Sequence, residues 1–178
     1  MKKTIEHFIK KNYIYIILFV FVTIFFFSLV KKAAIIFFLI FFSWFIKSYQ
    51  KKMPFYLGID LVLLSTVLTS YSYGFFIGTL TGFASMFVSS LWRGRFNPLT
   101  LTSYLIIALI ALIIPLFSTT NISLLGIIIT LFYDTLFLFL SIGFFDGRIS
   151  RGLTFAISHL FFNIFLFLKV APKLLGFM

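Results

Sequence analysis

The sequence predicts an all-α integral membrane protein, a polytopic bundle of six to seven transmembrane helices. Of its 178 residues, 62% are hydrophobic and only 11% are charged, whereas charged residues make up about a quarter of a soluble domain. A soluble chain of this length leaves roughly a third of its surface in water, which this composition could not cover with polar groups. The apolar residues also occur in runs of membrane-spanning length between short Lys and Arg clusters. These observations exclude a soluble globular domain and a disordered chain.

Seven apolar runs approach the roughly 20 residues that a spanning helix needs. They lack the two-residue polar alternation of membrane β-strands, so helices are expected. In chain order the runs are 13–30, 33–46, 57–73, 74–92, 99–117, 122–145 and 152–170.

The first two runs are separated by two lysines, Lys31 and Lys32. We expect 13–30 to be a retained anchor, because no small-residue cleavage site of a signal peptide follows it. The run 33–46 is short, and the lysines that flank it can extend toward the membrane surface. The chain is therefore expected to form a single transmembrane domain, 1–178. In it the extra N-terminal span 13–30 precedes a six-helix core at 33–178.

The third run contains Asp60 near its start. This carboxylate is expected to cap its helix or to reach lipid headgroups. Hydroxyl side chains crowd the second half of the run, at 65–73. In membrane helices such groups bond to their own turn or join neighbouring helices.

The fourth run carries glycines at a spacing of four residues, Gly74, Gly78 and Gly82. This spacing predicts one stripe along a helix, against which another backbone can approach closely. We expect the stripe to pack against a helix of the same chain.

The last three runs begin after turn signals. Asn97-Pro98 is typical of an N-cap followed by a first-turn proline, and it precedes 99–117. A polar turn at 118–121 precedes 122–145. Asp146-Gly147 is a turn dipeptide before 152–170.

Asp134, at the middle of the sixth run, is the first candidate functional residue. A carboxylate near the bilayer centre costs several kcal/mol unless it is paired or hydrated. We expect it to face the bundle interior and to pair with His159. His159 and Asn163 share one helix face, as interhelical hydrogen-bonding groups or as the polar rim of a small-molecule pocket. The candidate substrate-binding residues are Asp134, His159, Asn163, Arg93 and Arg95.

Composition also limits the chemistry. The chain has no cysteine, two histidines and four acidic residues, which excludes disulfides and cysteine metal sites. We therefore expect no metal, no cofactor and no enzymatic activity. The net charge of +11 comes from clusters that flank apolar runs, so the expected partner is the lipid bilayer of the cell membrane and not a nucleic acid.

Several motifs resemble the S components of energy-coupling factor transporters, small six-helix membrane subunits that capture vitamins or metal ions. The similarity covers roughly 33–178. It rests on Met53-Pro54-Phe55, Ile59-Asp60-Leu61, Tyr73-Gly74, Gly78, Gly82-Phe83, Asn97-Pro98, His159, Asn163, the Phe-rich 164–168, Ala171-Pro172 and Leu174-Leu175. It implies a small-molecule substrate and an energy-coupling membrane subunit as partner. The sequence is also similar to the MreD rod-shape family, which shares the Pro-Asp-Leu and Gly-rich sequence pattern. Members of that family are membrane scaffolds without a small ligand.

Two opposite orientations remain open. With seven spans, one side of the membrane carries 11 Lys and Arg and the other carries 4. The positive-inside rule then places the loops 47–56, 93–98 and 146–151 in the cytoplasm. The S-component resemblance implies instead that these loops lie outside, where Arg93 and Arg95 would attract an anionic solute.

Overall fold

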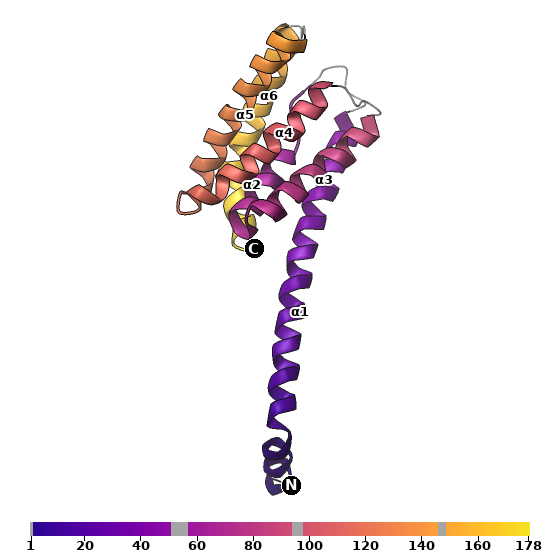
Figure 1. Ribbon diagram of the computed structural model, residues 1–178, viewed down its shortest axis with the longest axis vertical. Helices are drawn as coiled ribbons and strands as arrows, with labels where there is room; N and C mark the ends of the chain where they lie inside the picture. The colour runs from indigo at the N-terminus through magenta and orange to yellow at the C-terminus, as the bar shows by residue number, and fades with distance from the viewer. Residues whose placement is uncertain (1, 51–56, 94–97, 146–148) are drawn as a thin grey trace. The chain divides into compact units, whose positions relative to one another are not determined.

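The computed structural model describes residues 2–50, 57–93, 98–145 and 149–178, which are helical apart from short connections (Figure 1). No strand occurs in these ranges, so the all-α prediction is confirmed. The elements are α1 (Lys2–Gln50), α2 (Val62–Tyr73), α3 (Phe75–Arg93), α4 (Pro98–Ile113), the 3₁₀ turn η1 (Ile114–Phe117), α5 (Ile122–Phe145), α6 (Ile149–Phe165), the π-helical turn η2 (Leu166–Val170) and α7 (Ala171–Leu175).

The chain divides into two compact units, Met1–Ile35 and Ile36–Met178. The described part of the first unit belongs to α1, which continues into the second unit. The expectation of separate helices at 13–30 and 33–46 is therefore wrong. Helix α1 contains neither glycine nor proline, and lysines such as Lys31 and Lys32 are good helix formers, so nothing interrupts it.

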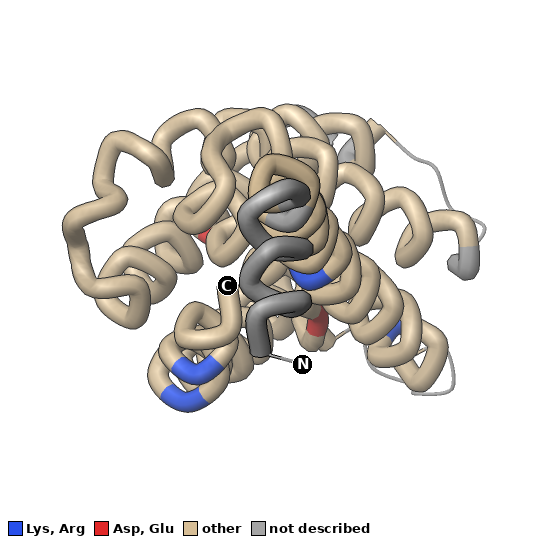
Figure 2. The backbone as a smooth tube through the Cα atoms, turned by 90° about the horizontal axis from the view of Figure 1, so that it is seen from below, with Lys and Arg blue, Asp and Glu red and all other residues tan. Residues whose placement is uncertain are grey.

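Four helices of the described residues are long and apolar enough to cross a membrane. These candidate spans are Tyr13–Gln50, Thr100–Phe117, Ile122–Gly143 and Gly152–Leu175, and Phe75–Leu91 is a shorter apolar helix. Figure 2 shows how few charged residues interrupt the described backbone. The composition and lengths of these helices are those of a membrane protein.

Helix α2 is shorter than the expected run 57–73, because 57–60 is not helical. Its 12 residues correspond to about 18 Å, less than the roughly 30 Å hydrocarbon core of a bilayer. All side chains from Val62 to Ser70 are buried, in contact with α3, α4, α5 and α7. This helix is enclosed by protein and does not have to match the thickness of the lipid.

The glycine stripe consists of two residues, not three. A Cβ atom at Gly78 would overlap Ser70 of α2, and one at Gly82 would overlap Thr66. Gly74 instead ends α2 with a φ of 86°, and a Cβ there would meet nothing within 4 Å. The spacing placed Gly74 inside the helix of the fourth run, but its positive φ puts it in the connection between α2 and α3.

Three hydroxyls of α2, those of Ser65, Thr66 and Thr69, bond as predicted. Thr66 donates to the carbonyl of Val62 at 2.8 Å, and Thr69 donates to that of Ser65 at 2.6 Å. The Ser65 hydroxyl also lies 3.1 Å from the Ser85 hydroxyl of α3. Together with Gly78 and Gly82, these bonds allow the two helices to approach closely.

Candidate functional site: a buried charged cluster

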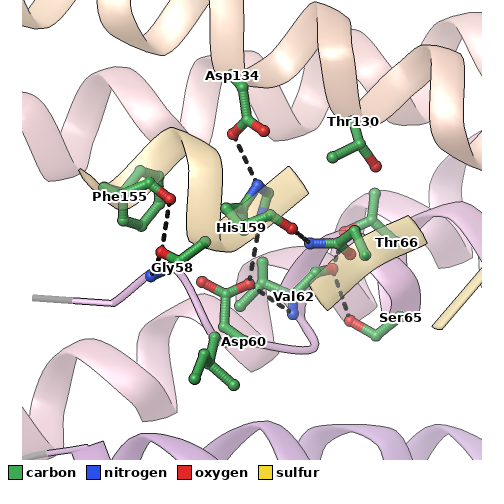
Figure 3. A network of polar contacts seen from close by, with 12 residues as sticks. Gly58, Asp60, Val62, Ser65, Thr66, Thr130, Asp134, Phe155 and His159 are labelled. Carbon is green, nitrogen blue, oxygen red and sulfur yellow. Dashed lines mark hydrogen bonds and ion pairs between the residues drawn. The ribbon is translucent and has the colours of Figure 1, made fainter. Parts of the chain in front are cut away.

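Four ionisable side chains meet inside the second unit, from α1, the segment before α2, α5 and α6. Figure 3 shows three of them, Asp60, Asp134 and His159. Lys47 Nζ lies 2.9 Å from Asp60 Oδ2. His159 Nδ1 lies 2.7 Å from Asp134 Oδ1, and its Nε2 lies 3.8 Å from Asp60 Oδ1. Each of the four residues is at most 9% exposed. Charges removed from water in this way are costly unless they neutralise one another.

The imidazole of His159 is held by its neighbours. It stacks on Phe155, with ring centroids 5.3 Å apart and planes 13° apart, and Tyr133 covers it from α5 at 5.3 Å. The ring is therefore fixed by packing before any ligand arrives, with a carboxylate near each of its nitrogens. Fixed orientation of this kind is what a recognition site requires.

The segment 57–60 lies beside this ring, and side chains satisfy its backbone. Gln50 donates from Nε2 to the carbonyls of Leu57 at 3.1 Å and Ile59 at 2.6 Å. The N–H of Gly58 donates to the Ser158 hydroxyl at 2.8 Å. Irregular backbone at membrane depth is tolerated only where protein supplies such partners. Asp60 accepts from the N–H of Val62, the first residue of α2, at 3.3 Å. The N-cap position itself is Leu61, so Asp60 contacts the start of the helix from one residue before the cap.

A second polar layer lies one helical turn from the His159–Asp134 pair. Helices α5 and α6 run side by side as a hairpin (Figure 1), so residues four positions before Asp134 and four positions after His159 are at the same level. These residues are Thr130 and Asn163, both 0% exposed. One turn further on, a Cβ at Gly126 would overlap the ring of Phe167, which confirms this register.

Two acceptors of this region have no hydrogen-bond partner within the part of the chain that the structure describes. They are Asp134 Oδ2 and Asn163 Oδ1. The amide of Asn163 is oriented by its Nδ2 donor, which lies 2.9 Å from the carbonyl of His159. Buried acceptors normally find a donor, so unsatisfied ones require an explanation.

The structure brings together three of the five candidate residues, Asp134, His159 and Asn163. The predicted pairing of Asp134 with His159 is confirmed by their hydrogen bond. Arg93 is the last residue of α3, but its side chain and the whole of Arg95 lie outside the described residues. Their expected role in attracting an anionic solute stays a prediction.

Sequence reasoning missed the partners that complete the cluster. Lys47 resembled a membrane-flanking anchor, Asp60 was expected at the membrane surface, and no role was assigned to Gln50 or Gly58. The available signal was that two opposite charges, Lys47 and Asp60, stand on either side of Pro54. They are 13 residues apart and separated by a proline, so helical periodicity could not predict that they pair.

An open apolar groove of about 500 Å³ lies apart from the cluster, between α3 and α4. It is lined by Leu80, Phe83, Ala84, Phe87, Leu101 and Tyr104. The Phe83 and Tyr104 rings meet edge to face in it, with centroids 5.2 Å apart. The groove offers hydrophobic contact and very little polar surface.

No family model, curated protein or solved structure matches the chain. Among the described residues, no three His, Asp or Glu side chains form a group that could hold a metal ion. The chemistry of the cluster is that of buried charged side chains and an amide, enclosed in an apolar helix bundle.

Proposed function

We propose that this protein is a membrane-embedded solute-binding and transport subunit, resembling an energy-coupling factor S component. The observation that carries the proposal is the gathering of Asp134, His159 and Asn163 between the C-terminal helices. Ionisable groups inside membrane bundles are expensive, and by default they mark substrate or ion pathways.

The pairing pattern supports binding over a purely structural role. A structural cluster gains most when every acceptor is satisfied, yet Asp134 Oδ2 and Asn163 Oδ1 have no partner among the described residues. Both groups are fixed, one by His159 and the other by a backbone carbonyl. The layer thus offers preorganised acceptors to a solute that carries hydrogen-bond donors.

In this proposal the chain is a multi-pass protein of the cell membrane with six passages. One is provided by α1 and the others by α2, α3, α4 with η1, α5, and α6 with the turns that follow it. Helix α2 is too short to cross lipid by itself. Its burial in the bundle and the side-chain partners of 57–60 support a passage within protein.

An MreD-like membrane scaffold without a small ligand is the second candidate. The groove between α3 and α4 favours it, because a partner helix could pack against this apolar surface.

A transport subunit would need an energy-coupling membrane subunit as its partner, and the transport proposal includes such a partner.

A thermal-shift screen of the purified chain against vitamins, metal ions and nucleobases tests the proposal. A specific ligand present at a hundred times its dissociation constant adds about 2.7 kcal/mol to the free energy of unfolding. A saturable rise in melting temperature with one ligand class supports the solute-binding function. A flat response across the library favours the scaffold.

A further inference from the structure

Each nitrogen of the buried His159 ring faces a carboxylate, and Figure 3 shows the ring between the two. Nδ1 forms a 2.7 Å hydrogen bond with Asp134 Oδ1, and Nε2 makes a longer, 3.8 Å ion-pair contact with Asp60 Oδ1. A neutral imidazole has one N–H and one bare lone pair, so it can donate to only one carboxylate. Its other nitrogen would turn a lone pair toward a carboxylate oxygen. Only the protonated ring presents an N–H to both carboxylates.

The charges around the ring also require one proton on it. Among the described residues, the titratable or charged side chains that face the ring are Asp134, Tyr133 and Asp60, and Lys47 of α1 reaches it through Asp60. The phenol of a tyrosine is uncharged near neutral pH. With an imidazolium, the two positive and two negative charges of the cluster cancel. A neutral ring would leave one negative charge uncompensated in an apolar bundle.

The proton belongs on the ring and not on the neighbouring carboxylate. In water an imidazolium holds its proton more tightly than a carboxylic acid does, by roughly two to three pH units. The negative charge of Asp60, 3.8 Å from Nε2, adds to this preference because it stabilises a cation on the ring. The bond between Nδ1 and Asp134 is therefore an imidazolium–carboxylate pair.

We infer that His159 is a proton-binding site and that the bound proton holds the segment 57–60 against α5 and α6. The imidazolium joins Asp60 of this segment to Asp134 of α5, while Lys47 connects the same Asp60 to α1. Release of the proton leaves a lone pair of Nε2 facing Asp60, which weakens the contact. The proton site does not depend on the proposed transport function, because it can be measured without any solute.

Nitrogen-15 NMR of the histidine ring, in the full chain in detergent, measures the protonation state directly. The chain has two histidines, so His7→Gln leaves His159 as the single ring signal. At pH 8 a free imidazole is only about 3% protonated. We expect both nitrogens of His159 to carry a proton at this pH. A ring with one bare nitrogen at pH 8 would overturn the proton site.

Two variants and a matched control, all in the His7→Gln background, identify the groups that hold the proton. Asp134→Asn and Asp60→Asn each remove one facing carboxylate, so the ring of either variant should be neutral at pH 8. Either variant is sufficient if the other does not fold. Thr130→Val changes a buried side chain of α5 without changing a charge, and its ring should stay protonated. A ring that keeps its proton after loss of a carboxylate would contradict the charge balance.

The same proton makes stability depend on pH. The folded chain retains a proton that an unfolded imidazole releases above about pH 6.5. The melting temperature should therefore fall as the pH rises from 6.5 through the titration of the folded ring. Asp134→Asn should lack this fall, because its ring is neutral in both states. Equal pH dependence in the two proteins would remove the role of the proton in holding the segment.

The outcomes of these measurements and of the solute screen are separable. A protonated ring at pH 8 without any solute hit retains the proton site and removes the proposed transport role. A solute hit on a chain whose ring is neutral at pH 8 removes the proton site alone.

Discussion

Gly58 and His159 are packed so closely that a side chain at position 58 would collide with the imidazole-bearing residue. A Cβ built on Gly58 overlaps His159 Cβ and the carbonyl oxygen of Phe155. The non-helical segment before α2 therefore lies directly against α6, at the level of the charged cluster. Only glycine permits this approach, and the resulting contact places Asp60 near the ring.

The first prediction concerns this contact. Gly58→Ala should lower the free energy of unfolding by about 1–3 kcal/mol, because overpacking forces the segment and α6 apart. Thermal unfolding in detergent measures the effect. Gly143→Ala is the control, since a Cβ at Gly143 meets nothing within 4 Å and alanine favours a helix over glycine by up to about 1 kcal/mol. Equal melting curves for the two variants would refute the close approach.

The second prediction concerns the α2–α3 contact. Gly78→Leu should destabilise the fold by about 3 kcal/mol, because its side chain would have to displace Ser70. Gly143→Leu adds the same side chain in open space, and it should unfold near the wild-type temperature. A Gly78→Leu protein as stable as this control would exclude the observed packing.

The third prediction addresses the buried ion pair. Lys47→Met should cost about 3 kcal/mol, because it leaves the Asp60 carboxylate buried without its ammonium partner. Adding Asp60→Asn to Lys47→Met should recover part of the loss, since the charge is removed and an oxygen remains to accept from the N–H of Val62. Lys31→Met, at an exposed position, is the control. Additive losses in the double variant would argue against the pairing.

The fourth prediction separates binding from folding at Asp134. Asp134→Asn should abolish the response to any solute found by the screen while the melting temperature stays near that of the wild type. The amide carbonyl can still accept from His159 Nδ1, and position 134 no longer carries a buried charge. A retained solute response in Asp134→Asn would remove this carboxylate from the binding site.

The fifth prediction decides the orientation. The chain has no cysteine, so Gly94→Cys is an unambiguous probe, although Gly94 lies outside the described residues. The S-component arrangement requires labelling by a membrane-impermeant maleimide on intact cells. Protection until the membrane is permeabilised would favour the charge rule, and it would turn Arg93 and Arg95 into cytoplasmic anchors.

Hydropathy predicted most of the helices. It did not predict that α2 is surrounded by protein and not by lipid. The run 122–145 coincides with α5, because its apolar residues are uninterrupted and a polar turn precedes it. The boundary between the runs 57–73 and 74–92 coincides with the end of α2. Gly74 was nevertheless assigned to the helix stripe, because a glycine at a four-residue spacing fits such a stripe as well as a position with positive φ. Helix α1 was divided at two lysines, although charge alone does not end a helix.

The site was predictable where it follows helical periodicity. His159 and Asn163 lie four residues apart, and Asp134 had to find a buried partner, so this pairing could be expected. Lys47 and Gln50 act across a connection to the segment 57–60. That contact depends on the tertiary path of an irregular segment, which no local pattern encodes.

The enclosure of α2 limits which amino-acid substitutions its positions can tolerate. The chain contains 29 phenylalanines, yet α2, with the sequence VLLSTVLTSYSY, has none. A surface that faces acyl chains accepts almost any bulky apolar residue, so substitution toward phenylalanine is cheap there. A helix surrounded by other helices accepts only side chains of fitting volume. Among homologous sequences, variation should therefore concentrate on the lipid-facing helices and spare the small hydroxyl-bearing residues of α2.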